Sequence, residues 1–268
     1  TQAEVTAKDT AARAGRKNLI INGRLGSDTM VNQRGFTSGT LADDAYGFDR
    51  WMSKSGASSI TLNASNITLT SGKLVQIIEN PFISGESVTV SASVSSGTLT
   101  GRLGTTDAFQ TLPFTTTAPS GDIRLELVGN GSVFTNVQLE LGSVATDFEH
   151  RSYGEILADC QRYFERINTE DSYGFFASGT AYDSNTGTVG LVYTTKRAKP
   201  TLTFSSVSHF KIQHGTTGMV VTNFASIQYG LDRALVDGNG VSGLTQNSGV
   251  ILISNNAASA YIEIDAEL

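Results

Sequence analysis

The sequence predicts an all-β fold, in which two antiparallel β-sandwich, jelly-roll-like domains are joined by one short α-helix. Charged residues make up only 16% of the 268 residues, and Gly supplies 28 of them, in a chain that is otherwise rich in Ser and Thr. Short segments in which apolar and polar residues alternate recur along most of the chain, as half-buried strands require. Only one segment, near residue 156, has the spacing of three and four that a helical face needs.

Composition and charge exclude several classes of protein. A hydrophobic content of 39% is too high for a disordered polymer, and no run of 18 apolar residues is present that could insert into a membrane. The net charge of -6, without a basic stripe, argues against nucleic acid as a partner. The single cysteine, Cys160, cannot form an intrachain disulfide. No cofactor motif is found, since Gly72 and Lys73 lack the upstream glycine of a phosphate-binding loop.

The first two segments differ in texture. Residues 1–17 are polar and rich in Ala, so they cannot build a core, and we interpret them as the remnant of a stalk. The sequence starts with Thr rather than Met, and we expect the rest of a longer protein on this N-terminal side. Residues 18–150 are predicted to form the first β-sandwich. Apolar side chains alternate strictly at 88–94, 123–127 and 137–141, so each of these segments presents one apolar face.

Residues 151–168 are predicted to form the linking helix. Apolar residues recur there at 156, 157, 160, 163 and 164, along one helical face. Ser152 and Glu155 have the S-x-x-E form of a capping box, which satisfies amides of the first turn. Arg162 and Arg166 are expected near the C-terminal end, where positive charge favours the helix dipole. Cys160 is interpreted as a small core residue on the apolar face.

Residues 169–268 are predicted to form a C-terminal receptor-binding β domain. Alternating texture returns there, and strands are expected near residues 188–193, 200–204, 219–224, 249–254 and 260–268. Two intervening segments, 179–187 and 232–249, are rich in Gly, Asn and Asp and are predicted to be loops. The second is long for a compact domain, and such loops are usually functional or mobile.

Five segments can be compared together with known families: 18–25 (NLIINGRL), 33–35 (QRG), 46–51 (YGFDRW), 137–166 (VQLELGSVATDFEHRSYGEILADCQRYFER) and 261–268 (YIEIDAEL). As a set they resemble the receptor-binding tail fibres of tailed bacteriophages. The first three are similar to the start of a carbohydrate-binding β-sandwich module, and the last resembles the final strand of a C-terminal fibre domain. The chain departs from the pattern at Asn32, because such fibres commonly carry a Trp directly before Gln-Arg-Gly.

The resemblance implies an extracellular virion protein that forms a homotrimer and adheres to a glycan on the bacterial host surface. Sugars are bound by aromatic faces flanked by amide, carboxylate and hydroxyl groups. Such side chains gather in the two predicted loops, and the candidate ligand-binding residues there are Tyr182, Asp183, Asn185, Asp237, Asn239, Gln246 and Asn247. Trp51 has two interpretations, as a filler of the sandwich core or as a ring that stacks on sugar.

Two alternatives to a non-catalytic adhesin stay open. A glycan depolymerase needs two carboxyl groups roughly 5 to 10 Å apart, and the candidate clusters are Asp43, Asp44 and Asp49, or Glu263, Asp265 and Glu267. A purely structural virion connector would use none of these side chains. No metal site or Ser-His-Asp triad is predicted, because the three histidines, His150, His209 and His214, lack the necessary partners nearby in the sequence.

Overall fold

The computed structural model describes residues 16–268, apart from the side chains of Ser226 and Ile227. The predicted stalk remnant therefore lies outside the described residues, except for Arg16 and Lys17. The chain divides into a first unit, which ends at Cys160 and also takes in Leu268, and a second unit, Gln161–Glu267. Within the described part, no helix has the length and apolar character needed to cross a membrane.

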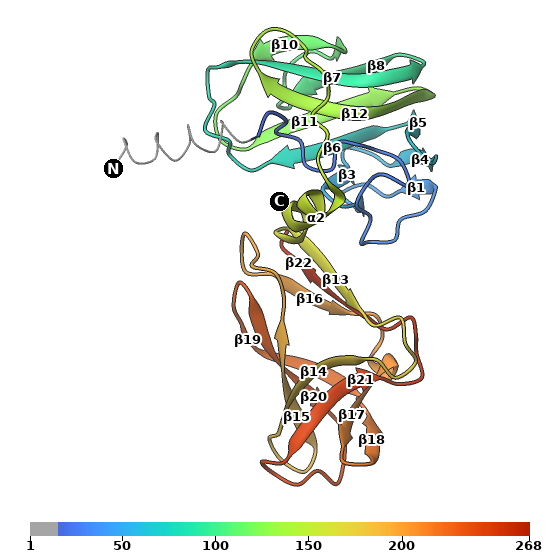
Figure 1. Cartoon of the computed structure of the whole chain (residues 1–268), viewed down its shortest axis with the longest axis vertical. Coiled ribbons are helices and arrows are strands. Elements are labelled where there is room, and N and C mark those ends of the chain that lie inside the picture. Colours follow the sequence, from blue (N-terminus) through green and yellow to red (C-terminus); the bar gives the residue numbers. More distant parts are fainter. Residues whose placement is uncertain (1–15) are drawn as a thin grey trace, which may run out of the picture. The chain divides into compact units, whose positions relative to one another are not determined.

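The first unit contains two six-stranded antiparallel sheets (Figure 1). The first sheet has the order β1 (Gly39–Leu41), β4 (Ser58–Leu62), β5 (Ile67–Ser71), β12 (Ser132–Leu141), β7 (Ser87–Ser96), β10 (Phe114–Thr117). The second has the order β2 (Tyr46–Phe48), β3 (Trp51–Ser53), β6 (Lys73–Ile78), β11 (Ile123–Gly129), β8 (Leu99–Leu103), β9 (Gln110–Thr111). Except for the pairs β2–β3, β4–β5 and β8–β9, the neighbouring strands are not consecutive in the sequence, so both sheets depend on long-range contacts.

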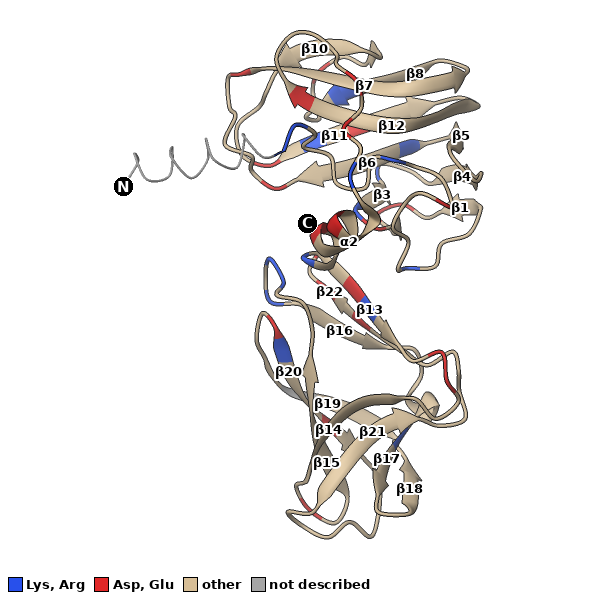
Figure 2. Cartoon of the chain, in the orientation of Figure 1, with Lys and Arg blue, Asp and Glu red and all other residues tan. Residues whose placement is uncertain are grey.

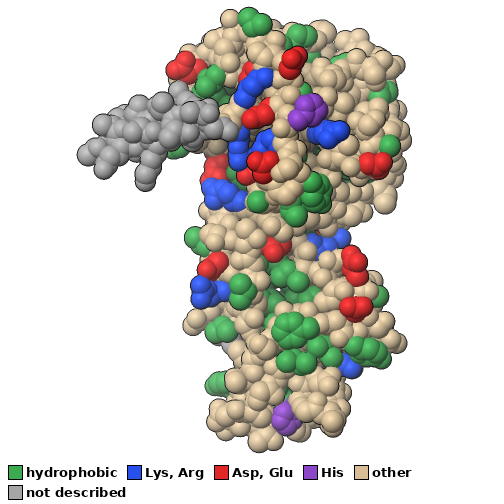
Figure 3. Space-filling view, viewed as in Figure 1, with side chains coloured by type: hydrophobic (Ala, Val, Ile, Leu, Met, Phe, Trp, Pro, Cys, Tyr) green, Lys and Arg blue, Asp and Glu red, His purple; other side chains and the backbone are tan. Residues whose placement is uncertain are grey.

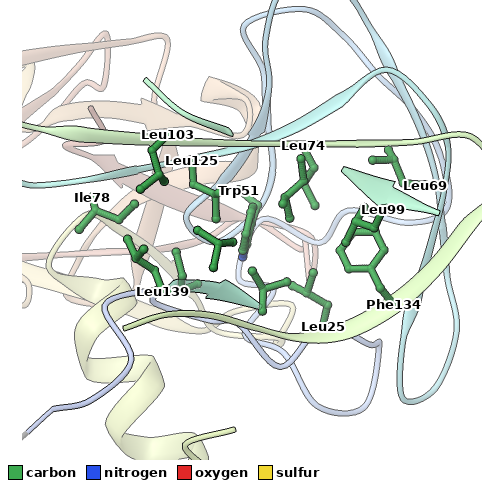
Figure 4. Close-up of a cluster of buried hydrophobic side chains, with 14 of the residues drawn as sticks. Leu25, Trp51, Leu69, Leu74, Ile78, Leu99, Leu103, Leu125, Phe134 and Leu139 are labelled. Atoms are coloured by element: carbon green, nitrogen blue, oxygen red, sulfur yellow. The ribbon is translucent and has the colours of Figure 1, made fainter. Parts of the chain in front are cut away.

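The alternation in the sequence builds the core between these sheets. On β11, Ile123, Leu125 and Leu127 are fully buried, because side chains of one strand face the same side at every second residue. Trp51 lies among these and other buried apolar side chains (Figure 4). Its indole Nε1 donates a hydrogen bond to the backbone oxygen of Asn22 at 2.9 Å, which satisfies its one polar atom inside the core.

One α-helix, α2 (Tyr153–Gln161), is present in the described residues, together with a short 3-10 helix, η1 (Val207–His209). The predicted capping box of α2 is confirmed: the Ser152 amide donates to Glu155 Oε2 at 2.9 Å, and the Glu155 amide donates to Ser152 Oγ at 3.4 Å. The predicted extent of the helix, to residue 168, is wrong. Residues after Gln161 leave the helix and form strand β13 (Phe164–Asn168), which pairs with β22 (Tyr261–Asp265).

The helix ends before residue 168 because the residues after Gln161 pair instead with a strand that is distant in the sequence. Arg166 lies opposite Glu263 in the β13–β22 ladder, and its guanidinium donates to Glu263 Oε1 at 2.5 Å. The last turn of α2 contains no basic residue, because Arg162 directly follows the last helical residue and Arg166 lies in β13. Cys160 is fully buried, as its core interpretation requires.

The second unit is built from a three-stranded and a seven-stranded antiparallel sheet. The smaller sheet has the order β13, β22, β16 (Thr201–Phe204). The larger has the order β18 (Thr217–Val220), β17 (Phe210–His214), β21 (Gly249–Ser254), β14 (Phe175–Ala181), β15 (Thr186–Val192), β20 (Arg233–Asn239), β19 (Asn223–Tyr229). Side chains from both sheets form one core, in which Phe204 stacks on Phe224 with ring centroids 3.9 Å apart. The predicted all-β fold is confirmed.

Strand prediction in this unit succeeds at β15, β16, β21 and β22 and fails elsewhere. The expected strand at 219–224 is split between the end of β18 and the start of β19. The expected loop at 232–249 contains strand β20, so the loop proper is 240–248. The inward positions of β20 are Ala234, Val236 and Gly238, and two small residues among three weaken the apolar alternation that marks a strand.

Candidate functional site

The candidate site is one end of the seven-stranded sheet, where two connections lie together. One is the β14–β15 connection, residues 182–185, and the other is the β20–β21 connection, residues 240–248. We call these two segments the loop tip (Figure 1). The turn between β17 and β18 lies at the same end of the sheet, because β17 pairs with β21 next to the start of the latter.

Backbone hydrogen bonds hold the two segments of the loop tip together. The Leu244 amide donates to Ser184 O at 3.2 Å, and the Asn247 amide donates to Ala181 O at 2.9 Å. The Ala181 amide in turn donates to Ser248 O at 2.9 Å. The two loops that the sequence predicts separately are therefore one connected surface.

Polar groups and one aromatic ring are presented on this surface. The Tyr182 side chain is 69% exposed, while its amide donates to Thr186 O at 2.9 Å and so closes the turn. The Asn185 amide donates to Asp183 Oδ1 at 2.8 Å, which fixes the carboxylate in an Asx turn. Gln246 and Asn247 are exposed on the second segment. Five of the predicted ligand-binding residues thus lie on one rim.

Two further predicted residues belong to strand β20 rather than to a loop. Asp237 is half-buried on the sheet, where its Oδ1 accepts a hydrogen bond from Thr188 Oγ1 at 2.5 Å. Asn239 is paired with Thr186, the first residue of β15, so it borders the loop tip. Both were predicted to lie in a loop, and this prediction is wrong because both lie in strand β20. Asn239 stays close to the surface formed by the other candidates, whereas Asp237 lies two residues further along the sheet.

Trp51 does not belong to any exposed site. Its side chain is fully buried in the first unit, and stacking on a sugar needs an accessible ring face. The interpretation of Trp51 as a ligand-binding residue is therefore corrected, and its role is to fill the core. Asn32 stands directly before Gln33, Arg34 and Gly35, and its side-chain amide forms hydrogen bonds with the backbone of Phe36.

The acidic clusters considered for catalysis are largely committed to other partners. Glu263 is paired with Arg166, whose guanidinium also lies 4.3 Å from the centroid of the Tyr261 ring. Asp49 is fully buried and accepts hydrogen bonds from the Gln33 amide and Gln33 Nε2, both at 2.6 Å. Burial raises the pKa of the Asp49 carboxyl, against these hydrogen bonds, which lower it. Asp44 forms an ion pair with Lys54 at the surface.

The described histidines and acidic residues do not form a metal site beside the loop tip. Among the described residues, no three or more His, Cys, Asp or Glu side chains are grouped so that they could hold a metal ion. His209 Nδ1 lies 3.0 Å from Ser205 Oγ, and His214 ends strand β17. Charged residues are sparse over the seven-stranded sheet (Figure 2). On the visible face of the first unit, basic and acidic side chains are interspersed (Figure 3).

A second hollow surface, in the first unit, was not found from the sequence. It is a groove of about 350 Å³ beside β5, β7 and β12. Most of the residues that line it are of polar types, and they include Arg24, Asn66, Ser93, Asn136 and His150 together with the apolar Val94. These residues come from several distant segments, so the only sequence signal would have been the density of Ser and Asn in each.

No protein-family model and no curated protein sequence matches the chain. Its function is therefore inferred from its own residues.

Proposed function

We propose that the chain is the distal part of a phage tail fibre, which adheres to a bacterial surface glycan through the loop tip without catalysis. The observation that carries the proposal is that backbone hydrogen bonds from 240–248 to Ser184 and to Ala181, the last residue of β14, join the two connections beside an exposed Tyr182. The assignment to a virion rests on the resemblance of five sequence segments to tail fibres, with the rest of the fibre on the N-terminal side.

The chemistry of the loop tip suits a polyhydroxylated ligand. The ring of Tyr182 offers an apolar face for the CH groups of a sugar, and amides of Asn185, Gln246 and Asn247 both donate and accept hydrogen bonds. Asp183 keeps further acceptor capacity on its carboxylate, because only Oδ1 accepts from the Asn185 amide. Since hydrogen bonds already fix the loops, binding would order few additional groups, which lowers its entropic cost.

A homotrimer belongs to the same proposal, and an apolar row on the seven-stranded sheet supports it. Phe175 on β14, Val192 on β15 and Leu235 on β20 are 57%, 78% and 41% exposed. These three strands are neighbours in the sheet, so the side chains occupy adjacent strands. Exposed apolar groups on adjacent strands are candidates for an interaction surface. Three copies of a weak glycan site on one axis would raise the effective concentration of each site for its ligand.

The first prediction tests the loop tip with a matched pair of variants. Tyr182→Ala removes the exposed ring at one end of β14, whereas Tyr173→Ala removes a ring that is 59% exposed just before the other end of the same strand. We expect Tyr182→Ala to weaken attachment to host cells at least tenfold, because stacking contributes on the order of 1 kcal/mol per site and three sites act together. Attachment is measured by flow cytometry with the labelled chain.

The control and the contradicting outcomes separate the three function classes. Tyr173→Ala is expected to attach like the unmodified chain, and the length of the surface polysaccharide is expected to stay constant during incubation. Equal attachment by the Tyr182→Ala chain would place the receptor site elsewhere. Shortening of the polysaccharide, abolished by Glu263→Gln or Asp44→Asn, would indicate a depolymerase. No attachment by any of the chains, even at high concentration, would indicate a structural connector.

A further inference from the structure

We propose that the groove in the first unit is a second ligand site, which binds a saccharide unit that carries a carboxylate group. The groove has a volume of about 350 Å³, which falls in the size range of small-molecule sites in proteins. This site lies in a different unit from the loop tip, and it does not depend on the function proposed for that surface.

The charge of the groove selects an anion. Arg24 is exposed, and its guanidinium makes no ion pair or hydrogen bond with any side chain among residues 16–268. His150 lies on the same groove, and its ring packs edge-on against Phe148, with centroids 5.1 Å apart. None of the residues that line the groove is acidic. An uncommitted guanidinium in an acid-free, polar hollow favours a carboxylate, which it can bind with two parallel hydrogen bonds.

The floor of the groove provides fixed hydroxyl and amide groups. A bulge interrupts the pairing of β12 with β7 between Thr135 and Gln138, and Asn136 within it has a φ of 54°. Asn136 Nδ2 donates to Ser93 Oγ at 3.3 Å, and Thr135 Oγ1 donates to Leu25 O at 2.7 Å. A bulge redirects side chains out of the sheet, and here it turns two polar residues into the hollow.

The remaining lining residues suit a sugar ring rather than a bare anion. Val94 is 37% exposed and is flanked by Ser93 and Ser95, so one apolar contact is surrounded by hydroxyl groups. Asn66 adds an amide from the start of the β5 hairpin. A small inorganic anion would use only the cationic part of this lining. A sugar acid would use the cationic, polar and apolar parts together.

The experiment uses the intact chain and four acidic oligosaccharides: tetramers of galacturonate and of mannuronate, a hyaluronan fragment and an oligosialic acid. Each is compared with its carboxyl-reduced counterpart, which keeps the ring and replaces the carboxylate by a hydroxymethyl group. Binding is measured by isothermal titration calorimetry. We expect at least one acid to bind at least tenfold more tightly than its reduced form, because hydrogen bonds to charged groups are the stronger ones.

Variants connect that binding to the groove. Arg24→Gln is expected to weaken binding of the acid about tenfold, in line with the loss of a charged hydrogen bond. Asn136→Gly is expected to weaken it several-fold through loss of the amide, while glycine retains the positive φ of the bulge. Lys54→Gln, which removes a charge of the first unit outside the groove, and Tyr182→Ala on the loop tip are both expected to bind like the unmodified chain.

Several results would overturn the proposal. These are the absence of binding by all four acids, equal binding of an acid and its reduced form, and retention of full affinity by both Arg24→Gln and Asn136→Gly. A loss of binding in Tyr182→Ala alone would assign the acid to the loop tip instead. The groove and the loop tip are tested by different variants. A negative result for one site therefore leaves the proposal for the other site unchanged.

Discussion

At the scale of single residues, Tyr193 shows how the second unit closes around a polar group. Its side chain is only 5% exposed, and its hydroxyl lies 2.9 Å from Arg233 O and 3.1 Å from Gly230 O. The hydroxyl has one hydrogen to donate, so these two acceptors share it. Burial, together with the negative charge of Asp232, raises the pKa of Tyr193 to about 12.

This pKa predicts a loss of stability in strongly alkaline solution. A tyrosine in the unfolded chain releases its proton near pH 10, whereas Tyr193 in the folded chain keeps it until about pH 12. Between these values the folded state binds more protons, so the free energy of unfolding decreases as the pH rises. We expect Tyr193→Phe to show a smaller decrease between pH 9.5 and 11.5, measured by urea unfolding.

An absorbance titration at 295 nm checks the same assignment without unfolding the protein. The chain has 8 tyrosines, and Tyr193, with its pKa raised to about 12, is expected to add a step at higher pH than the ordinary ionisation of a tyrosine near pH 10. The late step should be absent in Tyr193→Phe and present in Tyr173→Phe. A late step that persists in Tyr193→Phe would contradict the assignment.

Individual residues differ in how far the sequence predicted them. The capping box of Ser152 and Glu155 was predicted correctly, because both partners lie within one helical turn. Of the two interpretations of Trp51, the one as a filler of the sandwich core agrees with its complete burial. The exposure of Arg24 beside His150 could not be predicted, since the two residues meet only through the folding of the chain between them.

At the scale of elements, β13 is attached to the rest of the second unit by a buried ion pair. Lys196 is fully buried, and its Nζ lies 2.7 Å from Glu165 Oε2 and 2.5 Å from the backbone oxygen of Gln161. The Thr194 amide also donates to Glu165 Oε2, at 2.9 Å. Burial lowers the pKa of Lys196, against the attraction of the Glu165 carboxylate, which raises it.

Removal of one partner of this pair is expected to destabilise the second unit strongly. Glu165→Leu leaves the Lys196 ammonium buried without its counterion, and breaking a buried pair in this way costs about 3 kcal/mol or more. The loss of stability is measured as the decrease in the urea concentration at the midpoint of unfolding, which is followed by circular dichroism. The double variant Glu165→Leu/Lys196→Met should recover much of the stability, because no buried charge remains. A single variant as stable as the unmodified chain would show that the pair contributes little.

The elements that the sequence missed share a physical cause. Strand β20 carries Ala234 and Gly238 at inward positions, and β13 follows a helix with apolar residues that suit either structure. In both cases the segment becomes a strand because it pairs with a strand that is far away in the sequence. This partner is β15 for β20 and β22 for β13. Local pattern identifies strands with large alternating side chains, and pairing determines the others.

At the scale of the whole molecule, residues 16–268 contain two principal hydrophobic cores, one in each unit. The first includes Trp51, and the second includes residues such as Phe210 and Ile262. The sequence predicted two β blocks on either side of a helix, but it could not predict that the loops 182–185 and 240–248 would meet. That contact follows from the strand order β21, β14, β15, β20, which brings together segments about sixty residues apart.

The single tryptophan makes the two cores separately observable. Trp51 is the only Trp of the chain and is buried in the first unit, so its fluorescence reports the unfolding of that unit. We expect Glu165→Leu to lower the urea concentration at which the second unit unfolds, seen as an earlier transition in circular dichroism. The urea midpoint of the Trp51 fluorescence change is expected to stay the same. An equal shift of both midpoints would show that the two cores unfold as one cooperative system.

The loop tip has one formal charge, on Asp183, and its remaining side chains are neutral. Dissolved ions screen attraction between charges but leave ring stacking and neutral hydrogen bonds largely intact. An adhesin of this composition would therefore hold its host equally well in fresh water and in brine. Attachment through the guanidinium of Arg24, in contrast, would weaken as the electrolyte becomes more concentrated, so the surroundings of the host would decide how much each of the two surfaces contributes.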